Sequence, residues 1–283
     1  MTNWRGKHNY LARRVGERAL DRLLLGGWFA KWSYRFGLHG KLGVTHYAVE
    51  LAPHKKLSTP LKIAFASDFH AGPTTHPQIF DDLFDEIDRQ QADLLLLGGD
   101  FVSCQARYTE EFSARLSCLN PRFGKYAVLG NHDLWVSEVE LSKALKEAGV
   151  EVLINQNCAL PAPYDSVSIC GLDDPWTGTP DPHQTFHNAG EVRILLMHAP
   201  DGLLLLDGHC FDFSLAGHTH GGQVALADGT PIVVPHGPLC RKYWFGRHAI
   251  ENNGSLIVSR GIGCSTLPIR LNADPELVIC TVS

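Results

Sequence analysis

The feature that most constrains the fold is a repeated arrangement in which a short apolar run ends abruptly in a polar residue that can bind a metal. Apolar runs of four to eight residues bounded by turn residues indicate buried strands. Five runs follow this pattern. They span residues 61–67, 94–97, 126–129, 194–197 and 211–216, and they lead into Asp68-Phe69-His70, Asp100, Asn131-His132-Asp133, His198 and His218-Thr219-His220.

Helix signals lie between the first of these strands. Pro77 precedes apolar residues at helical spacing, and Ser137 with Glu140 forms a capping box for a second helix, which Gly149 ends. Alternating strands and helices predict right-handed crossover units, in which the carboxyl ends of the strands share one edge of the sheet. We therefore expect the polar termini to converge in one cleft. Further strands are expected over residues 152–155, 167–170, 256–259 and 277–282, without ligands.

The polar residues at these strand ends form a metal-binding set. Carboxylate oxygen, amide oxygen and imidazole nitrogen suit Mn, Fe, Zn, Co or Ni rather than Ca. More candidates are present than one ion takes from protein when a position stays open for water, so we expect two ions bridged by a carboxylate, with Asp100 as the bridge. The seven candidate ligands are Asp68, His70, Asp100, Asn131, His198, His218 and His220.

These blocks, with glycines at 99, 130 and 217, resemble in their order the signature of the calcineurin-like metallophosphoesterases. Residues 241–243 and 259–263 resemble the bacterial YkuE/YaeI-type branch. The resemblance implies an α/β fold, a four-layer αββα sandwich of two mixed sheets flanked by helices. It also implies which residues share an ion, a division that spacing alone leaves open. One ion would take Asp68, His70, Asp100 and His220, and the other Asp100, Asn131, His198 and His218.

The resemblance also implies a mechanism. Two divalent ions, with Mn, Fe or Zn expected, would activate a bridging water for attack on a phosphoester or phosphoanhydride bond. His132 resembles the family histidine that protonates the leaving oxygen, and Asp133 is expected to orient it. Arg241, Lys242 and Tyr243 lie in a Gly/Pro-flanked loop that could grip the substrate, although a solvated surface turn is the alternative.

The substrate stays open at this stage. The branch that the chain resembles includes phosphodiesterases and enzymes that cleave the pyrophosphate of UDP-2,3-diacylglucosamine, so a lipid-linked or nucleotide-sugar substrate is one hypothesis. The alternatives are a soluble phosphomonoesterase and a non-catalytic metal-binding scaffold of the same fold, which degraded ligands would mark. A metal-dependent amidohydrolase would open with His-x-His, where this chain has Asp68-x-His70.

The basic charge is concentrated at the front of the chain. The net charge is −5, which argues against nucleic acid as the main partner, yet residues 1–56 carry eleven Lys or Arg against Glu17, Asp21 and Glu50. We expect residues 1–58 to form a basic extension and residues 59–283 the catalytic domain. A helix over residues 10–36 would place Leu20, Leu24, Trp28 and Trp32 on one stripe, either against an anionic membrane or on the domain itself.

The eight cysteines are widely spaced without a C-x-x-C pair, so we expect reduced, mostly buried thiols. No apolar run reaches the roughly 18 residues of a spanning helix. Arg13-Arg14 resembles a twin-arginine signal, but charged residues interrupt the apolar stretch behind it. The expected location is cytoplasmic, with peripheral contact to the inner face of the membrane through residues 10–36. Nothing in the sequence indicates an oligomeric state.

Overall fold

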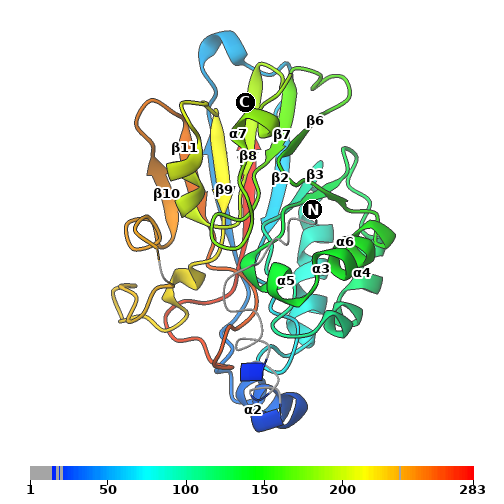
Figure 1. Ribbon diagram of the computed structural model, residues 1–283, viewed down its shortest axis with the longest axis vertical. Coiled ribbons are helices and arrows are strands. Elements are labelled where there is room, and N and C mark those ends of the chain that lie inside the picture. The colour runs from blue at the N-terminus through cyan, green and yellow to red at the C-terminus, as the bar shows by residue number, and fades with distance from the viewer. Residues whose placement is uncertain (1–14, 17–18, 20–21, 236) are drawn as a thin grey trace, which may run out of the picture.

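Two six-stranded sheets lie face to face at the centre of the molecule (Figure 1). The computed structural model describes residues 15–16, 19, 22–235 and 237–283. The first sheet has the order β1-β12-β2-β3-β4-β5, with strands Gly43–Val49, Glu276–Val282, Leu61–Ala66, Leu94–Leu97, Lys125–Ala127 and Glu151–Val152. The second sheet has the order β10-β11-β9-β8-β7-β6, with strands Gly246–Ala249, Ser255–Val258, Phe213–Ala216, Val192–Leu196, Val167–Gly171 and Gln156–Ala159.

Both sheets are mixed, with a parallel centre. β2 to β5 run parallel, and β12 pairs antiparallel with β2. In the second sheet β11, β9, β8 and β7 run parallel, whereas β10 and β6 form antiparallel edges. The five strands expected to end in ligands all belong to these parallel centres, so their carboxyl ends share an edge.

The alternation of side chains along each strand builds two different cores. In β2, Ile63 and Phe65 pack between the sheets, whereas Ala64 and Ala66 face the helices. The intersheet core draws on both sheets, for example Leu96 of β3 and Ile194 of β8. Burial on both faces explains why these strands are continuous apolar runs in the sequence.

Helices cover the outer face of each sheet. The first sheet is covered by α3 to α6, which span Gln78–Gln90, Ser113–Cys118, Asn131–Val136 and Glu138–Glu147. The outer face of the second sheet packs against residues beside α7 (Pro182–Thr185) and the 3-10 segment η4 (Pro200–Leu205). Further 3-10 turns are η2 (Pro53–Lys55), η3 (Ala106–Glu111) and η5 (His220–Gly222). The predicted αββα sandwich is confirmed.

The amino-terminal region differs from the prediction in two respects. β1 pairs with β12 along its whole length, so residues 43–49 of the expected extension belong to the first sheet. The expected continuous helix is interrupted, because Gly26 and Gly27 adopt left-handed φ angles of 60° and 91° in the 3-10 turn η1 (Leu25–Gly27). Helix α2 (Trp28–Arg35) begins after this turn. Residues 10–14, 17–18 and 20–21 of the predicted helix lie outside the described residues.

Two expectations about the whole chain can also be compared with the structure. All eight cysteines are free thiols, and four of them are buried. In the described part of the chain, no helix combines the length and the apolar character needed to cross a bilayer.

Candidate metal centre

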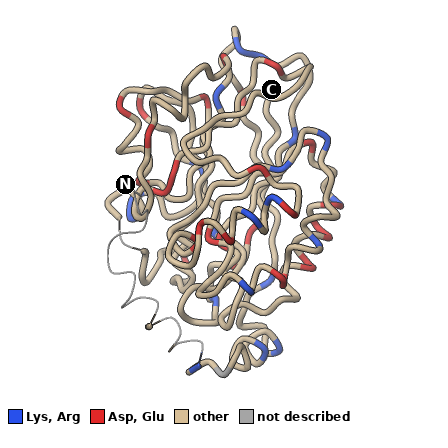
Figure 2. Tube along the Cα trace, turned by 45° about the vertical axis from the view of Figure 1, so that its right-hand side comes forward, with Lys and Arg blue, Asp and Glu red and all other residues tan. Residues whose placement is uncertain are grey.

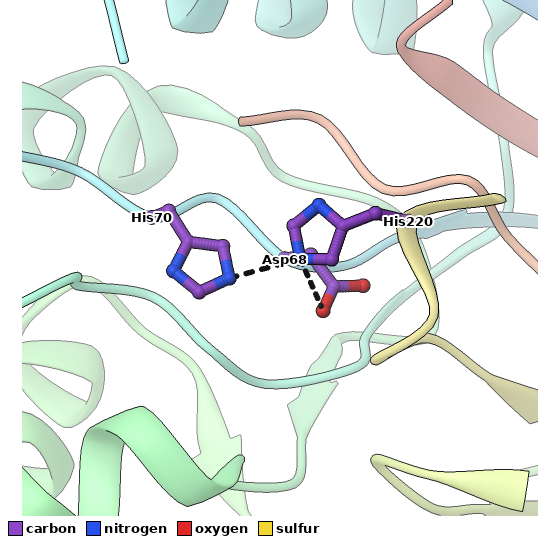
Figure 3. Close-up of side chains that lie close together, drawn as sticks. All are labelled: Asp68, His70 and His220. Atoms are coloured by element: carbon purple, nitrogen blue, oxygen red, sulfur yellow. Dashed lines mark hydrogen bonds and ion pairs between the residues drawn. The ribbon is translucent and has the colours of Figure 1, made fainter. Parts of the chain in front are cut away.

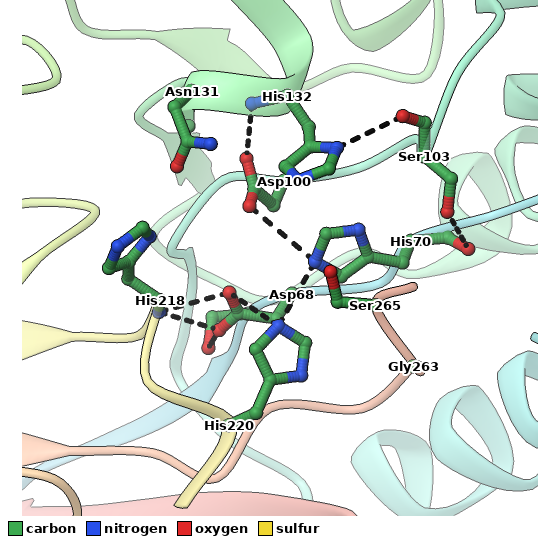
Figure 4. A network of polar contacts seen from close by, with 12 residues as sticks. Asp68, His70, Asp100, Ser103, Asn131, His132, His218, His220, Gly263 and Ser265 are labelled. Atoms are coloured by element: carbon green, nitrogen blue, oxygen red, sulfur yellow. Dashed lines mark hydrogen bonds and ion pairs between the residues drawn. The ribbon is translucent and has the colours of Figure 1, made fainter. Parts of the chain in front are cut away.

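The structure brings all seven candidate ligands together at one edge of the two sheets (Figure 4). Asp68 and His70 follow β2, Asp100 follows β3, and Asn131 begins α5 after β4. His198, His218 and His220 follow β8 and β9 of the second sheet. All are buried except His218, which is half-buried.

The first cluster consists of Asp68, His70 and His220 (Figure 3). The Nε2 atoms of the two imidazoles lie 3.0 Å apart. His220 Nε2 also lies 3.5 Å from Asp68 Oδ1. Three ligand atoms from two different sheets therefore converge on one small volume.

The second cluster consists of Asp100, His198 and His218, with Asn131 beside them. His198 Nε2 lies 3.1 Å from His218 Nδ1 and 3.1 Å from Asn131 Oδ1. Its distance to Asp100 Oδ2 is 3.3 Å. This cluster again combines imidazole, carboxylate and amide groups.

Asp100 links the two clusters. Its Oδ2 atom lies 3.5 Å from His70 Nε2 and 3.3 Å from His198 Nε2, while its Oδ1 atom accepts a hydrogen bond of 2.8 Å from the backbone NH of His132. His220 falls with Asp68, and His218 falls with Asp100. This is the grouping that the family resemblance implied.

The donor set fits divalent cations. His198 Nδ1 donates to the carbonyl of Gly98 at 2.8 Å, which directs Nε2 into the cluster, as such bonds do for metal-binding histidines. The Nε2 atoms of His70 and His220 face each other, and two lone pairs cannot hydrogen-bond to one another. Without a cation, one of these two atoms must therefore carry a proton. A cation satisfies both lone pairs together with the adjacent carboxylate oxygens.

The electrostatics of the site point the same way. Burial raises the pKa of Asp68 to about 6. Burial opposes ionisation of Asp100 too, but the charges of His198 and His132 hold its pKa well below the usual range. The pKa of His198 is raised well above the usual range because Asp100 and Asp68 outweigh the effect of burial. Burial and mutual charge thus perturb the ionisation of several neighbouring groups at one place, as is common at functional sites.

Backbone strain is concentrated in the ligands. Asp68, His70, Asp100, His218 and His220 all have left-handed φ angles, between 45° and 71°. Such conformations cost about 1–3 kcal/mol each in a non-glycine residue and persist where the surrounding structure imposes them. Two glycines of the family blocks leave the space that these carboxylates occupy. A Cβ atom at Gly130 would lie 2.2 Å from Asp100 Oδ1, and one at Gly217 would lie 2.2 Å from Asp68 Oδ2.

His132 lies beside the ligands, and Asp133 has a different role from the one expected. His132 Nδ1 donates to the carbonyl of Ser103 at 3.0 Å, and its ring packs edge-on against His70 at 4.6 Å. Asp133 was expected to orient the His132 ring. Its oxygens accept instead from the backbone NH groups of Phe101 at 2.8 Å and Gly130 at 2.9 Å. Asp133 therefore joins the Asp100 turn to the Asn131 turn.

A cavity of about 730 Å³ opens above the two clusters. Its base is polar and includes His70, Asp100 and His132. Its walls are mostly apolar, and among the described lining residues there is no Lys or Arg. The apolar lining residues are Trp135, Trp176, Val224, Ile232, Val233, Pro235 and Leu267.

The sequence-based interpretation placed substrate contacts elsewhere. Arg241, Lys242 and Tyr243 do not line the cavity. Tyr243 packs against the outer core of the second sheet instead, and its ring lies 4.8 Å from His248. The loop supports the site from outside the cavity. The carbonyl of Trp244 accepts a 2.7 Å hydrogen bond from the hydroxyl of Thr219, which lies between His218 and His220. A basic loop carries no sequence signal of the direction in which it faces.

Two contributors to the site were missed. Arg270 is buried, and its guanidinium contacts His220 Nδ1 at 3.2 Å and the carbonyls of Arg260 and Ala273 at 2.9 and 2.8 Å. Trp176 follows Asp174, whose Oδ2 accepts its backbone NH at 3.0 Å. β7 leads through Leu172 into Asp173-Asp174, the same strand-to-carboxylate pattern as in the other blocks, so that signal was present in the sequence. The burial of Arg270 had no such signal.

Comparisons with known proteins identify the family of the chain. The profile of the calcineurin-like phosphoesterases matches residues 61–259. The phosphodiesterase YaeI of Escherichia coli K12 is 32% identical over 81% of this chain and 84% of its own. The metallophosphoesterase YkuE of Bacillus subtilis 168 is 32% identical over 69% of this chain and 70% of its own.

Among solved structures, a 5'-nucleotidase precursor of Thermus thermophilus aligns with 78% of this chain and 55% of its own. The TM-score is 0.48 and the identity 17%. The profile match spans the strands that carry the clusters around Asp100. The chain therefore belongs to the calcineurin-like phosphoesterases, a family of metal-dependent hydrolases, in the bacterial branch of YaeI and YkuE.

Proposed function

We propose that this protein hydrolyses a phosphodiester or phosphoanhydride bond in a substrate that carries an apolar group, such as a lipid-linked or nucleotide-sugar compound. The observation that carries the proposal is the division of one cavity into a polar base, formed by the two clusters, and apolar walls. A site for small, fully polar esters has no need of such walls.

The seven clustered side chains are assigned as ligands of two divalent transition-metal ions, with Mn, Fe or Zn expected. When bound, such ions activate water and neutralise phosphoryl charge. His132 lies at the cavity with its ring orientation set by Ser103, and we assign it protonation of the leaving oxygen. Asp133 supports the site by fixing the two turns that carry Asp100 and Asn131.

The charge of the cavity favours a diester over a monoester. A phosphodiester carries one negative charge, whereas a monoester carries nearly two at neutral pH. No Lys or Arg is found among the described residues that line the cavity, so beyond the charge of the proposed ions no cationic side chain is available there for a second anionic oxygen. The name of the relative YaeI, a phosphodiesterase, supports the same choice. The intact ligand set argues against a non-catalytic scaffold.

The proposal includes a cytoplasmic location with peripheral contact to the membrane. The eight free thiols support a reducing compartment. The described part of the predicted contact, residues 10–36, includes α2, whose surface is treated below.

The test is a comparison of substrates with metal-reconstituted full-length protein. Turnover is measured for the diester bis-p-nitrophenyl phosphate, the monoester p-nitrophenyl phosphate and UDP-2,3-diacylglucosamine. UDP-N-acetylglucosamine serves as the match to the diacylated sugar, because it lacks the long acyl chains. We expect the diester to exceed the monoester, and the diacylated sugar to exceed its match in kcat/KM by about tenfold, the value of one buried apolar group. A preference for the monoester would overturn the proposal.

A further inference from the structure

Helix α2 displays a row of aromatic side chains to solvent. Trp28 is 59% exposed and Phe36 61% exposed, with Phe29 and Trp32 exposed between them. These rings contact one another, Phe29 with Trp32 at 5.7 Å and Trp32 with Phe36 at 4.8 Å. The spacing of three, four and eight residues places them on one face of the helix. An exposed apolar cluster of this kind marks an interaction surface rather than a core.

The opposite face of α2 holds the helix in place. Ser33 is buried, and its hydroxyl donates to the carbonyl of Pro268. His39 Nδ1 lies 3.1 Å from the same hydroxyl, and its Nε2 accepts from the backbone NH of His76 at 3.2 Å. The ring of Tyr34 stacks on that of His76 at 4.3 Å. Hydrogen bonds and one stacking contact thus fix α2 to the loops of Pro268 and His76. This attachment sets the direction in which the aromatic row faces.

The anchor of α2 adjoins the rim of the cavity. Leu267 precedes the Pro268 that anchors α2, lines the cavity and is 54% exposed. Its carbonyl accepts a 2.7 Å hydrogen bond from Gln223, at the start of the loop that carries Ile232 and Val233. Ile232 and Val233 also line the cavity and are 60% and 71% exposed. In Figure 1, α2 and both loops lie at the lower end of the molecule.

We define the docking face as Trp28, Phe29, Trp32, Phe36, Ile232, Val233 and Leu267. Its helical part is flanked in sequence by basic residues, and among the described residues the one acidic contact of α2 is that of Tyr34, which donates to Asp82 Oδ2 at 3.3 Å. Residues 22–41 contain Arg22, Lys31, Arg35 and Lys41 and no acidic residue. Figure 2 shows blue segments and no red ones at this lower end. On the rim loop, Asp228 adds one negative charge. Aromatic rings flanked by Lys and Arg are the composition of helices that lie in the interface of an anionic bilayer.

We infer that the docking face binds the surface of an anionic phospholipid bilayer. Ile232, Val233 and Leu267 belong both to this face and to the cavity wall, so docking turns the mouth of the cavity toward the lipid. A substrate with an acyl chain then reaches the metal centre without crossing water. The docking names the surface behind the peripheral contact included in the proposed function. It does not depend on the proposed hydrolysis, whereas the route of the substrate does.

The test is co-sedimentation of the full-length protein with vesicles of phosphatidylcholine mixed with phosphatidylglycerol, and with vesicles of phosphatidylcholine alone. We expect binding to the mixed vesicles and a loss of at least about tenfold in affinity in the double variant Trp32→Ser/Phe36→Ser, because two interfacial side chains are removed. The variant Lys31→Gln/Arg35→Gln should lose the preference for the anionic vesicles. The matched control is Val139→Ser/Leu204→Ser, which alters two exposed apolar residues elsewhere and should bind like the wild type.

Turnover of bis-p-nitrophenyl phosphate should be the same in all these variants, since none of the altered residues lines the cavity. Absence of wild-type binding, or equal binding of Trp32→Ser/Phe36→Ser, overturns the inference. Light scattering after size exclusion tests the alternative that a second copy of the chain occupies this face. A wild-type dimer that ignores vesicles and dissociates in the double variant would make this face an interface between two copies, and would also overturn the inference. Vesicle binding needs no turnover, so inactivity toward every phosphoester would contradict only the proposed function.

Discussion

The base and the rim of the cavity are built in opposite ways. At the base, buried side chains such as Asp68 and Asp100 are held by hydrogen bonds and by left-handed backbone that tolerates little change. At the rim, Ile232, Val233 and Leu267 lie exposed on loops. Chemistry requires a geometry fixed to a fraction of an ångström, whereas recognition of an apolar group requires mainly contact area. Changes at the base should therefore alter turnover, and changes at the rim should alter binding.

The largest effect is expected at the residue that links the two clusters. Asp100→Asn removes the charge shared by the two predicted ions, so both should be lost. Bound metal stabilises the transition state by several kcal/mol, which corresponds to a fall in turnover of about 10³-fold or more. The loss of metal is measured by mass spectrometry, and the loss of turnover by kcat on bis-p-nitrophenyl phosphate. A variant that keeps its metal and its activity would contradict the role of the base.

His132 tests whether proton transfer can be separated from metal binding. His132→Ala should retain both ions but lose about 10²- to 10³-fold in kcat, the usual contribution of a positioned acid. Rescue by a substrate with a better leaving group distinguishes this role from a structural one, because such a substrate needs no proton. If the variant instead loses its metal, His132 belongs with the ligands and not with the acid catalysts.

Gly217 tests how tightly the base is packed. In Gly217→Ala the new methyl group would lie 2.2 Å from Asp68 Oδ2, which must displace that carboxylate. A shift of about 1 Å can cost about 10²-fold in rate. The control is Gly43→Ala, whose methyl group would meet only the carbonyl of Pro275 at an ordinary 3.8 Å. Equal kcat/KM in the two variants would show that the base tolerates movement.

The smallest effect is expected at the rim. Val233→Ser should raise KM for UDP-2,3-diacylglucosamine by about tenfold, since part of one apolar contact is lost. Turnover of bis-p-nitrophenyl phosphate should not change. Leu226→Ser is the matched control, because Leu226 is exposed on the same loop but does not line the cavity. A fall in kcat for both substrates would show that Val233 acts like the residues of the base. It would contradict the distinction between a base that sets turnover and a rim that sets binding.

The base was predictable from the sequence because each ligand follows a strand that is buried on both faces. Such strands appear as apolar runs, and the polar residue after each run stands out. The edge strands lacked this signal. β6 (Gln156–Ala159) and β10 (Gly246–Ala249) are short and largely polar, and β1 alternates exposed and half-buried residues. Their pairing depends on neighbours that are distant in the sequence.

The rim and the supporting contacts were not predictable for a different reason. Ile232 and Val233 belong to a loop, where no periodicity shows which way a side chain faces. Arg270 could be assigned to the site only from its burial. The same limit applies to Asp133, because its sequence position gives no sign that it accepts from the backbone NH groups of Phe101 and Gly130.

The position of β12 has a consequence for the order of folding. This strand, Glu276–Val282, is the neighbour of both β1 and β2, although most of the chain separates it from them. β1 joins the sheet only through β12, so it must wait during synthesis until residues 276–282 have left the ribosome. Contacts between such distant segments form slowly and leave apolar surface open meanwhile. A truncation that removes β12 would thus take out an internal strand and detach β1 from the sheet, instead of trimming its edge.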